Sequence, residues 1–375
     1  MKKINFFVVA LAAMSMFSCS KEDVGGDSAQ TGTKASVTVK ITGAKESMSR
    51  AAGDPGTTTD VTVNDYIIYL FSESGNLVGT PKYVASSADG TVDDANTSAS
   101  KVYVVANTGA LASGNPFLTV TSEADLKTRV GSLINGEASS QDKGNLWMCG
   151  SGDVGTFTPG TGAGNPSTAS ATVQLKFVAA RIDVIVKDNR TNNVAGTGKI
   201  SIADNRVALL FAGASGKFFA TAADQVKQTS FYSGITTTTT ENTTEKSVLA
   251  DNVTTPFTAN ATGTVEYHFY TFGYDGATQL GGRELPTILT IQSTRTNADA
   301  SNTTIYYPVQ FTTTDAGMTI EPGMKYTVTL TLNGDVGNGE GGGTTDPETE
   351  VRPANITVTV TPATWTPKIV NKDFN

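Results

Sequence analysis

Few side chains of this chain are suited to catalysis, because its 375 residues include only two cysteines and one histidine. A catalytic thiol would need Cys149 beside His268, which lies far away in the sequence, and no paired carboxylates or triad accompany them. Cys149 in "NLWMCGSG" is most simply a small buried hydrophobe, and His268 in "EYHFYTF" a structural strand residue. We therefore predict no enzymatic activity, no cofactor and no metal.

The chemistry that the sequence does favour is covalent processing near the N-terminus. A positively charged start and a short apolar run precede "MFSCSKED", where Ser18 and Cys19 resemble a bacterial lipobox although Met16 and Phe17 depart from it. We expect residues 1–18 to be a lipoprotein signal peptide and Cys19 to carry acyl chains such as palmitate, which anchor the precursor in the outer membrane. Ordinary secretory cleavage nearby is the alternative.

A second candidate processing site follows the first predicted strand. In "VTVKITG", Val37, Val39 and Ile41 fall on one face, which is the alternation of a half-buried strand. The strand runs into a polar segment with Gly and Pro that contains Arg50 followed by Ala51. Such an arginine is accessible to a protease, although it could also be an ordinary solvated loop residue.

Composition favours a β-rich extracellular protein. Hydrophobic residues make up 38% and charged residues only 17% of the chain, and Thr, Ser, Gly and Asn are abundant. The formal net charge of -8 argues against a nucleic-acid surface, which needs a basic stripe. Short β-runs between turn signals predict β-sandwich architecture.

One helix is expected within "TSEADLKTRVGSLING". Ser122 and Asp125 fit a capping pattern, and Leu126, Val130 and Leu133 have the spacing of a buried stripe. The helix lies in the N-terminal domain, which makes the predicted fold mainly β with one short helix.

Composition shifts divide the chain into segments. A stretch rich in Gly, Ser, Thr and Pro predicts a boundary between two sandwich domains, and "GDVGNGEGGGTTDPETEVRP" predicts a flexible linker. The expected segments after the signal peptide are a propeptide with the first strand (19–50), the N-terminal sandwich (51–170), the C-terminal sandwich (171–333), the linker (334–354) and a final strand (355–375).

The final segment has the same kind of pattern as the first strand. Ile356, Val358 and Val360 alternate with threonines in "ITVTV", and Trp365 can extend the contact. A lone strand is not stable in water, so it must pair with another subunit or within its own chain.

Nearly the whole chain resembles a fimbrillin of the FimA type, a structural subunit of the type V fimbriae of Bacteroidales. The resemblance rests on the lipoprotein start, the strand before Arg50, "YVVANTGAL", "FVAARIDVIV", "YYPVQF" and the final strand with "ATW". It implies two transthyretin-like β-sandwiches and cleavage by an arginine-specific surface protease, here after Arg50 with Ala51 as the new N-terminus. The strand with Val37, Val39 and Ile41 then leaves.

The resemblance also implies how subunits join. The vacated groove accepts the donor strand of a neighbouring copy, and head-to-tail repetition makes a filament on the cell surface. We expect a shaft subunit, since a tip needs no donor strand and an anchor need not be cut. A tip or anchor subunit is one alternative, and a monomeric lipoprotein that stacks glycans on Trp147 or Tyr274 is another.

Overall fold

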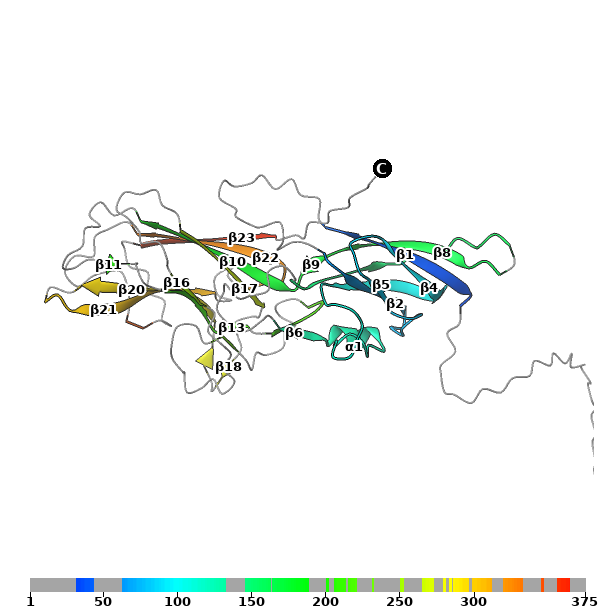
Figure 1. Cartoon of the computed structure of the whole chain (residues 1–375), viewed down its shortest axis with the longest axis horizontal. Helices are drawn as coiled ribbons and strands as arrows, with labels where there is room; N and C mark the ends of the chain where they lie inside the picture. The colour runs from blue at the N-terminus through cyan, green and yellow to red at the C-terminus, as the bar shows by residue number, and fades with distance from the viewer. Residues whose placement is uncertain are drawn as a thin grey trace, which may run out of the picture. The chain divides into compact units, whose positions relative to one another are not determined.

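The chain is mainly β with one short helix, as predicted, over the part that the structure describes (Figure 1). Within these residues no helix is long and apolar enough to cross a membrane. The computed structural model describes residues 32–43, 63–132, 146–162, 164–188, 200–201, 206–213, 215–220, 231–232, 250–252, 265–272, 279–280, 283–284, 286–296, 299–311, 320–332, 345–346 and 356–364.

Two sheets form the first sandwich. The smaller has the order β4-β1-β8 and the larger the order β3-β2-β5-β7-β9. Their strands are β1 (Lys34–Thr42), β4 (Gly90–Asn96) and β8 (Ser167–Gln174), then β3 (Lys82–Val84), β2 (Tyr66–Ser72), β5 (Ala99–Ala106), β7 (Met148–Asp153) and β9 (Lys176–Phe177).

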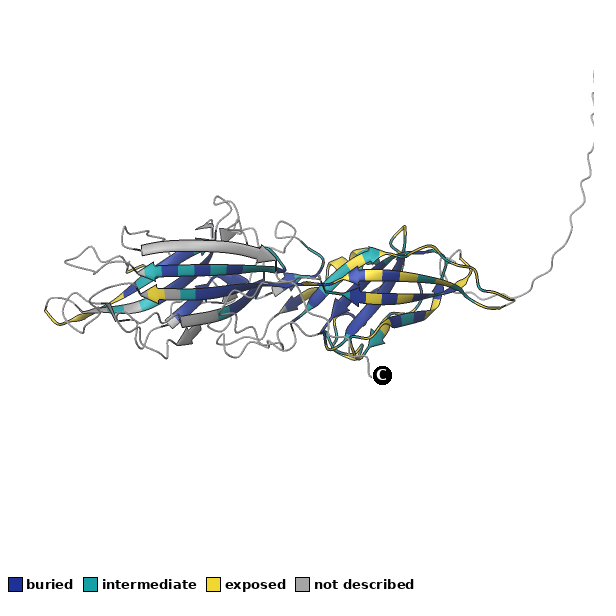
Figure 2. Cartoon of the chain, turned by 90° about the horizontal axis from the view of Figure 1, so that it is seen from above, coloured by how far each residue is buried: buried dark blue, intermediate teal, exposed yellow. Residues whose placement is uncertain are grey.

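The two sheets differ in how many of their faces are covered. Strand β1 alternates between buried and exposed residues, so the smaller sheet has one wet face, visible as alternating colours in Figure 2. The first six residues of β2 are all buried, which means that the larger sheet is covered on both faces. Its second face packs with Phe117, Val120, Leu126 and Phe218, which come from loops and the helix.

The helix is shorter than its sequence pattern suggests. Helix α1 covers only Glu123–Lys127, and the Ser122 side chain caps it by accepting a hydrogen bond from the Asp125 N–H. Leu126 is buried as expected, but the placement of Val130 on a helical stripe is wrong. Val130 begins β6 (Val130–Ser132), which pairs with β14 (Ser215–Lys217), because a strand partner overrides the local helical spacing. Leu133 lies outside the described residues.

The second sandwich also consists of two main sheets. One has the order β15-β13-β17-β10-β22-β23, and the other β11-β20-β12-β16 with β21 on β20. The strands of the first sheet are β15 (Phe231–Tyr232), β13 (Ala212–Gly213), β17 (Val265–Phe272), β10 (Ala179–Asp188), β22 (Met324–Leu332) and β23 (Ile356–Thr364). Those of the second are β11 (Ile200–Ser201), β20 (Thr287–Thr296), β12 (Arg206–Leu210), β16 (Ala250–Asn252) and β21 (Asn302–Phe311), and β18 (Gln279–Leu280) pairs with β19 (Arg283–Glu284).

The core of the second sandwich follows from strand alternation. Ile182 and Val184 of β10 pack in one buried cluster with Val328 and Leu330 of β22, to which β10 runs parallel. Buried residues of β20 and β21 complete this cluster from the facing sheet. The apolar residues at every second position therefore meet between the two sheets.

The division between the sandwiches lies later than the expected boundary between residues 170 and 171. That boundary falls inside β8, all of which pairs with β1, and β9 still pairs with β7 of the first sandwich. The second sandwich starts with β10. The Gly/Ser/Thr/Pro-rich composition that suggested the earlier boundary belongs in part to the polar outer face of β8.

Candidate functional site: the first strand and its groove

The first strand occupies the middle of the smaller sheet. It pairs antiparallel with β4 on one side and parallel with β8 on the other. The pairing with β8 is continuous from Ala35 opposite Ser167 to Thr42 opposite Gln174. Because both edges of β1 are paired, its removal would expose backbone groups of two neighbouring strands.

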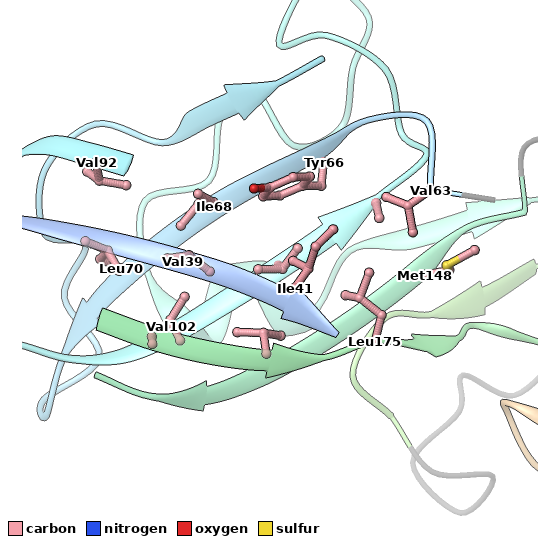
Figure 3. Packing of buried hydrophobic residues seen from close by; sticks show 14 of the residues in the cluster. Val39, Ile41, Val63, Tyr66, Ile68, Leu70, Val92, Val102, Met148 and Leu175 are labelled. Atoms are coloured by element: carbon pink, nitrogen blue, oxygen red, sulfur yellow. The ribbon is translucent and has the colours of Figure 1, made fainter. Parts of the chain in front are cut away.

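The apolar residues of β1 fill the core of the first sandwich. Val37 and Val39 have no exposed surface, and Ile41 is 2% exposed. Figure 3 shows Val39 and Ile41 pointing toward side chains of the facing sheet. Burial of each such side chain contributes about 1.5–3 kcal/mol, so an emptied groove would be strongly apolar. The neighbours in this cluster include Tyr66, Ile68, Leu70, Val92, Val102 and Leu175.

The outer face of β1 makes polar contacts at two threonines. The Oγ1 atoms of Thr38 and Thr91 lie 3.1 Å apart, and the Thr42 hydroxyl donates to the Val173 carbonyl at 3.5 Å. The ladder ends where the Leu175 N–H donates to the Thr42 carbonyl at 3.0 Å. Lys40 on the same face is exposed.

Both predicted processing sites lie outside the described residues. Arg50 and Ala51 fall in residues 44–62, and Cys19 falls in residues 1–31. The described chain resumes at Val63, which is 5% exposed and belongs to the same core cluster as Ile41. A cut at Arg50 would therefore leave β1 held to the first sandwich by non-covalent contacts alone.

The final strand pairs within its own chain in this structure. Strand β23 runs antiparallel to β22, with Ile356 opposite Leu332, Val358 opposite Leu330 and Val360 opposite Val328. It is the last strand in the order of its sheet, so among the described strands only one of its edges is paired. Trp365 lies outside the described residues.

A buried asparagine organises the loop after β5. Asn107 is 1% exposed, has a φ of 62°, and donates through Nδ2 to the Leu146 carbonyl at 2.9 Å. Its Oδ1 accepts from the Asn64 N–H at 2.8 Å. Asp65 supports the same loop, since its carboxylate accepts from the Gly109 N–H at 3.0 Å. The segment "VVANTGA" thus has a structural role, and its Asn and Gly were the available sequence signals.

Cys149 is an inert structural thiol. Burial raises its pKa to about 12, and its sulfur accepts a hydrogen bond from the Phe219 N–H at 3.4 Å. Such a thiol carries almost no thiolate at neutral pH, so it is not a nucleophile.

The proposed sugar-stacking aromatic is engaged in packing. Trp147 is half-buried, its ring centroid lies 5.3 Å from that of Phe218, and it occupies the space that a Cβ on Gly131 would need. Trp147 is therefore only partly accessible, because this side chain helps to cover the larger sheet. Tyr274 lies outside the described residues.

His268 is a structural strand residue, as predicted. Its Nδ1 donates to the Asp183 carboxylate at 2.8 Å, and the Arg181 Nε donates to the same oxygen at 2.6 Å. Burial alone would raise the pKa of Asp183, but the hydrogen bond from His268 and the charge of Arg181 lower it overall. No group of three or more metal-binding side chains occurs among the described residues.

Comparison with known proteins identifies two family models. The model of the FimA-like major fimbrial subunit protein, C-terminal domain, matches residues 179–365, and that of the major fimbrial subunit protein (FimA) matches residues 35–204. No curated protein matches the chain.

Two solved structures also match nearly the whole chain. A candidate cell adhesion protein from Bacteroides eggerthii is 44% identical, with a TM-score of 0.72, and the match covers 91% of this chain and 98% of that one. A second one from Parabacteroides distasonis shares the fold at 17% identity, with a TM-score of 0.52 over 91% of this chain and 99% of that one. The chain therefore belongs to the FimA-like family of major fimbrial subunits, which are not enzymes.

Proposed function

We propose that this protein is the shaft subunit of a cell-surface fimbria that supports adhesion. The precursor is exported as a lipoprotein acylated at Cys19, and an arginine-specific protease cuts after Arg50 to leave Ala51 as the N-terminus. Strand β1 then leaves, and a segment containing Ile356, Val358 and Val360 of a neighbouring copy takes its place. Trp365 extends this contact.

The central position of β1 supports this proposal most strongly. A removable strand at a sheet edge would expose little, whereas β1 carries Val37, Val39 and Ile41 into the core and is paired on both sides. Strand β23 has the same alternation of residues and is paired on one side only among the described strands. Transfer into a neighbour's groove would pair both of its edges.

Conversion of the precursor by an arginine-specific protease tests the cleavage step. We expect Arg50→Ala and Arg50→Lys to prevent filament formation, which electron microscopy measures. The parent protein should be cut so that its new N-terminus is Ala51. Arg50→Lys is the matched control because it keeps the charge and removes only the recognised residue. Filaments from either variant, or a mature N-terminus other than Ala51, would contradict this mechanism.

Removal of the donor segment tests the polymerisation step. Cut protein lacking residues 355–375 should remain monomeric in size-exclusion chromatography, because no strand can fill the neighbouring groove. It should still be cut at Arg50, which separates a polymerisation defect from a processing defect. Undiminished polymerisation of this variant would refute the donor assignment.

The joint presence of Arg50 and the final strand favours a shaft subunit over a tip or anchor subunit. A tip subunit needs a groove but no donor strand, and an anchor subunit can keep its first strand. Immunogold labelling along fimbriae distinguishes these positions, since a shaft subunit labels the full length and the others label one end.

A further inference from the structure

The groove of the first sandwich and the final strand match each other in more detail than strand alternation alone requires. This inference rests on the function proposed above. We propose that the final strand of a second copy of this chain inserts into the groove left by β1 in one register and one direction. Ala354–Pro362 of that copy occupies the positions of Ala35–Gly43 and runs parallel to β8, as β1 does.

The two segments agree over nine positions. The first is "ASVTVKITG" (35–43) and the second is "ANITVTVTP" (354–362). Alanine stands at the first position of both, and β-branched apolar residues stand at the third, fifth and seventh. The threonines at the fourth and eighth positions are also identical.

The first inward-facing position fixes the register. Ala35 has no exposed surface and lies opposite Ala95 of β4, which is 2% exposed, so this end of the groove takes a small side chain. A shift of two residues one way places Arg352 at this site, and a shift the other way places Ile356 there. The first buries a charge and the second overpacks the core, while a one-residue shift turns the apolar side chains to solvent.

Backbone hydrogen bonding favours insertion parallel to β8, because this direction places Pro362 where no N–H is needed for pairing. The Thr42 carbonyl accepts from the Leu175 N–H, so even-numbered residues of β1 direct their backbone groups toward β8 and odd-numbered ones toward β4. The register with β4 ends at Val39, so no described pairing with β4 uses the N–H of residue 43. Pro362, which has no N–H, is therefore compatible with this position.

The reverse direction places the proline badly. It would bring Pro362 to the site of Ala35, which is buried and paired with Ala95. A proline there lacks a ladder donor and adds ring volume where the groove is narrow.

The outer face agrees with the forward direction. Thr38 and Thr42 are the two residues of β1 whose hydroxyls contact Thr91 and the Val173 carbonyl. In the proposed register Thr357 and Thr361 occupy these same positions and can repeat both contacts. Lys40, whose side chain is exposed, is replaced by Thr359 without loss of a buried contact.

Disulfide trapping in filaments tests this register. In a Cys149→Ala parent, Thr361→Cys is combined with Gln174→Cys, Thr172→Cys or Thr168→Cys, which lie on β8 opposite positions 42, 40 and 36. The full-length precursor is cut, polymerised, oxidised mildly and analysed on denaturing gels. We expect a ladder of covalent multimers only for the pair with Gln174→Cys, and none from uncut protein.

The other outcomes are distinct. Trapping through Thr168→Cys would show the reverse direction, and trapping through Thr172→Cys a two-residue slip; either result, or filaments with no trapping, overturns the register. Failure of the cut protein with Cys149 intact to form filaments would instead count against the proposed function itself.

A matched pair of substitutions in the final strand tests, without cysteines, whether the position of Ala35 accepts only a small side chain. Ala354→Leu should slow filament growth at least tenfold, because leucine cannot enter the site of Ala35. Asn355→Leu, which the register places on the outer face, should change the rate less than twofold. Equal rates for the two variants would overturn the register even if filaments form normally.

Discussion

At the scale of single residues, Asn107 shows why a short motif in this chain is specific. The turn after β5 needs a left-handed backbone, and its interior position needs a side chain that both donates and accepts hydrogen bonds. Asparagine meets both needs, since it tolerates a positive φ and carries an amide. From the sequence, only the Asn and Gly of this segment point to a turn, because the partners Asn64 and Leu146 are distant in sequence.

Replacement of Asn107 should weaken the first sandwich. We expect Asn107→Ala to cost about 2–5 kcal/mol, because it leaves the Asn64 N–H and the Leu146 carbonyl without this partner and strains a β-carbon at positive φ. Asn107→Gly should cost less, since it removes only the hydrogen bonds. Chemical denaturation measures both, and equal losses would show that the backbone conformation contributes nothing.

Glu123 should make stability depend on acidity. Hydrogen bonds from Lys127, and also from Tyr103 and Lys101, lower its pKa from 4.5 to about 2. The stability it contributes is therefore fully present above pH 4.5 and is lost as the pH falls toward 2. We expect Glu123→Gln to be less stable at pH 7 and to lose less stability between pH 4.5 and 2 than the parent. Parallel pH profiles in thermal denaturation would contradict this.

At the scale of elements, strands with one solvent-exposed face could be predicted from the sequence. The length of the helix could not. Alternation located β1 correctly, since its polar and apolar residues face different surroundings. Helix α1 ends early because Val130 pairs in β6 with β14, a partner about 85 residues later that no local pattern reveals. The covered second face of the larger sheet is likewise a product of distant segments.

Phe218 should be important for the packing that covers the second face of the larger sheet of the first sandwich. Its side chain is fully buried, with ring centroids 4.9 Å from Phe117 and 5.3 Å from Trp147. We expect Phe218→Ala to destabilise the first sandwich by about 3–5 kcal/mol through the cavity it leaves. Leu118→Ala is the control, because Leu118 is 47% exposed and should change stability by less than about 0.5 kcal/mol. Similar losses for both variants would show that Phe218 does not close this face.

At the scale of the whole molecule, family resemblance predicted more than composition did. The two sandwiches and the final strand follow from the order of the motifs, whereas the division after β9 required the observed pairing of β8 with β1. The internal pairing of β23 could not be predicted, since the same alternating residues suit a groove in another copy or an edge of its own sheet.

In cut protein that lacks residues 355–375, the strands that flank the empty groove should be less protected from amide hydrogen exchange. We expect amide hydrogen exchange to quicken in β4 and β8, which lose a paired neighbour when β1 leaves, and to stay unchanged in β20 and β21. A synthetic peptide of residues 34–43 should restore protection. Faster exchange throughout both sandwiches, or none in β4 and β8, would contradict a local groove.

The parallel pairing of β1 with β8 also bears on the order of folding. Val37 lies opposite Ala169, so the first strand made must wait for a partner 132 residues later in the chain. Closing a loop of this length is slower than bringing together β2 and β5, whose paired residues lie only 27 to 40 positions apart, so β1 is expected to dock late. In this order of folding an empty groove is a stage through which every new chain passes, and the proposed proteolysis at the cell surface would return the molecule to that earlier stage of its own biogenesis.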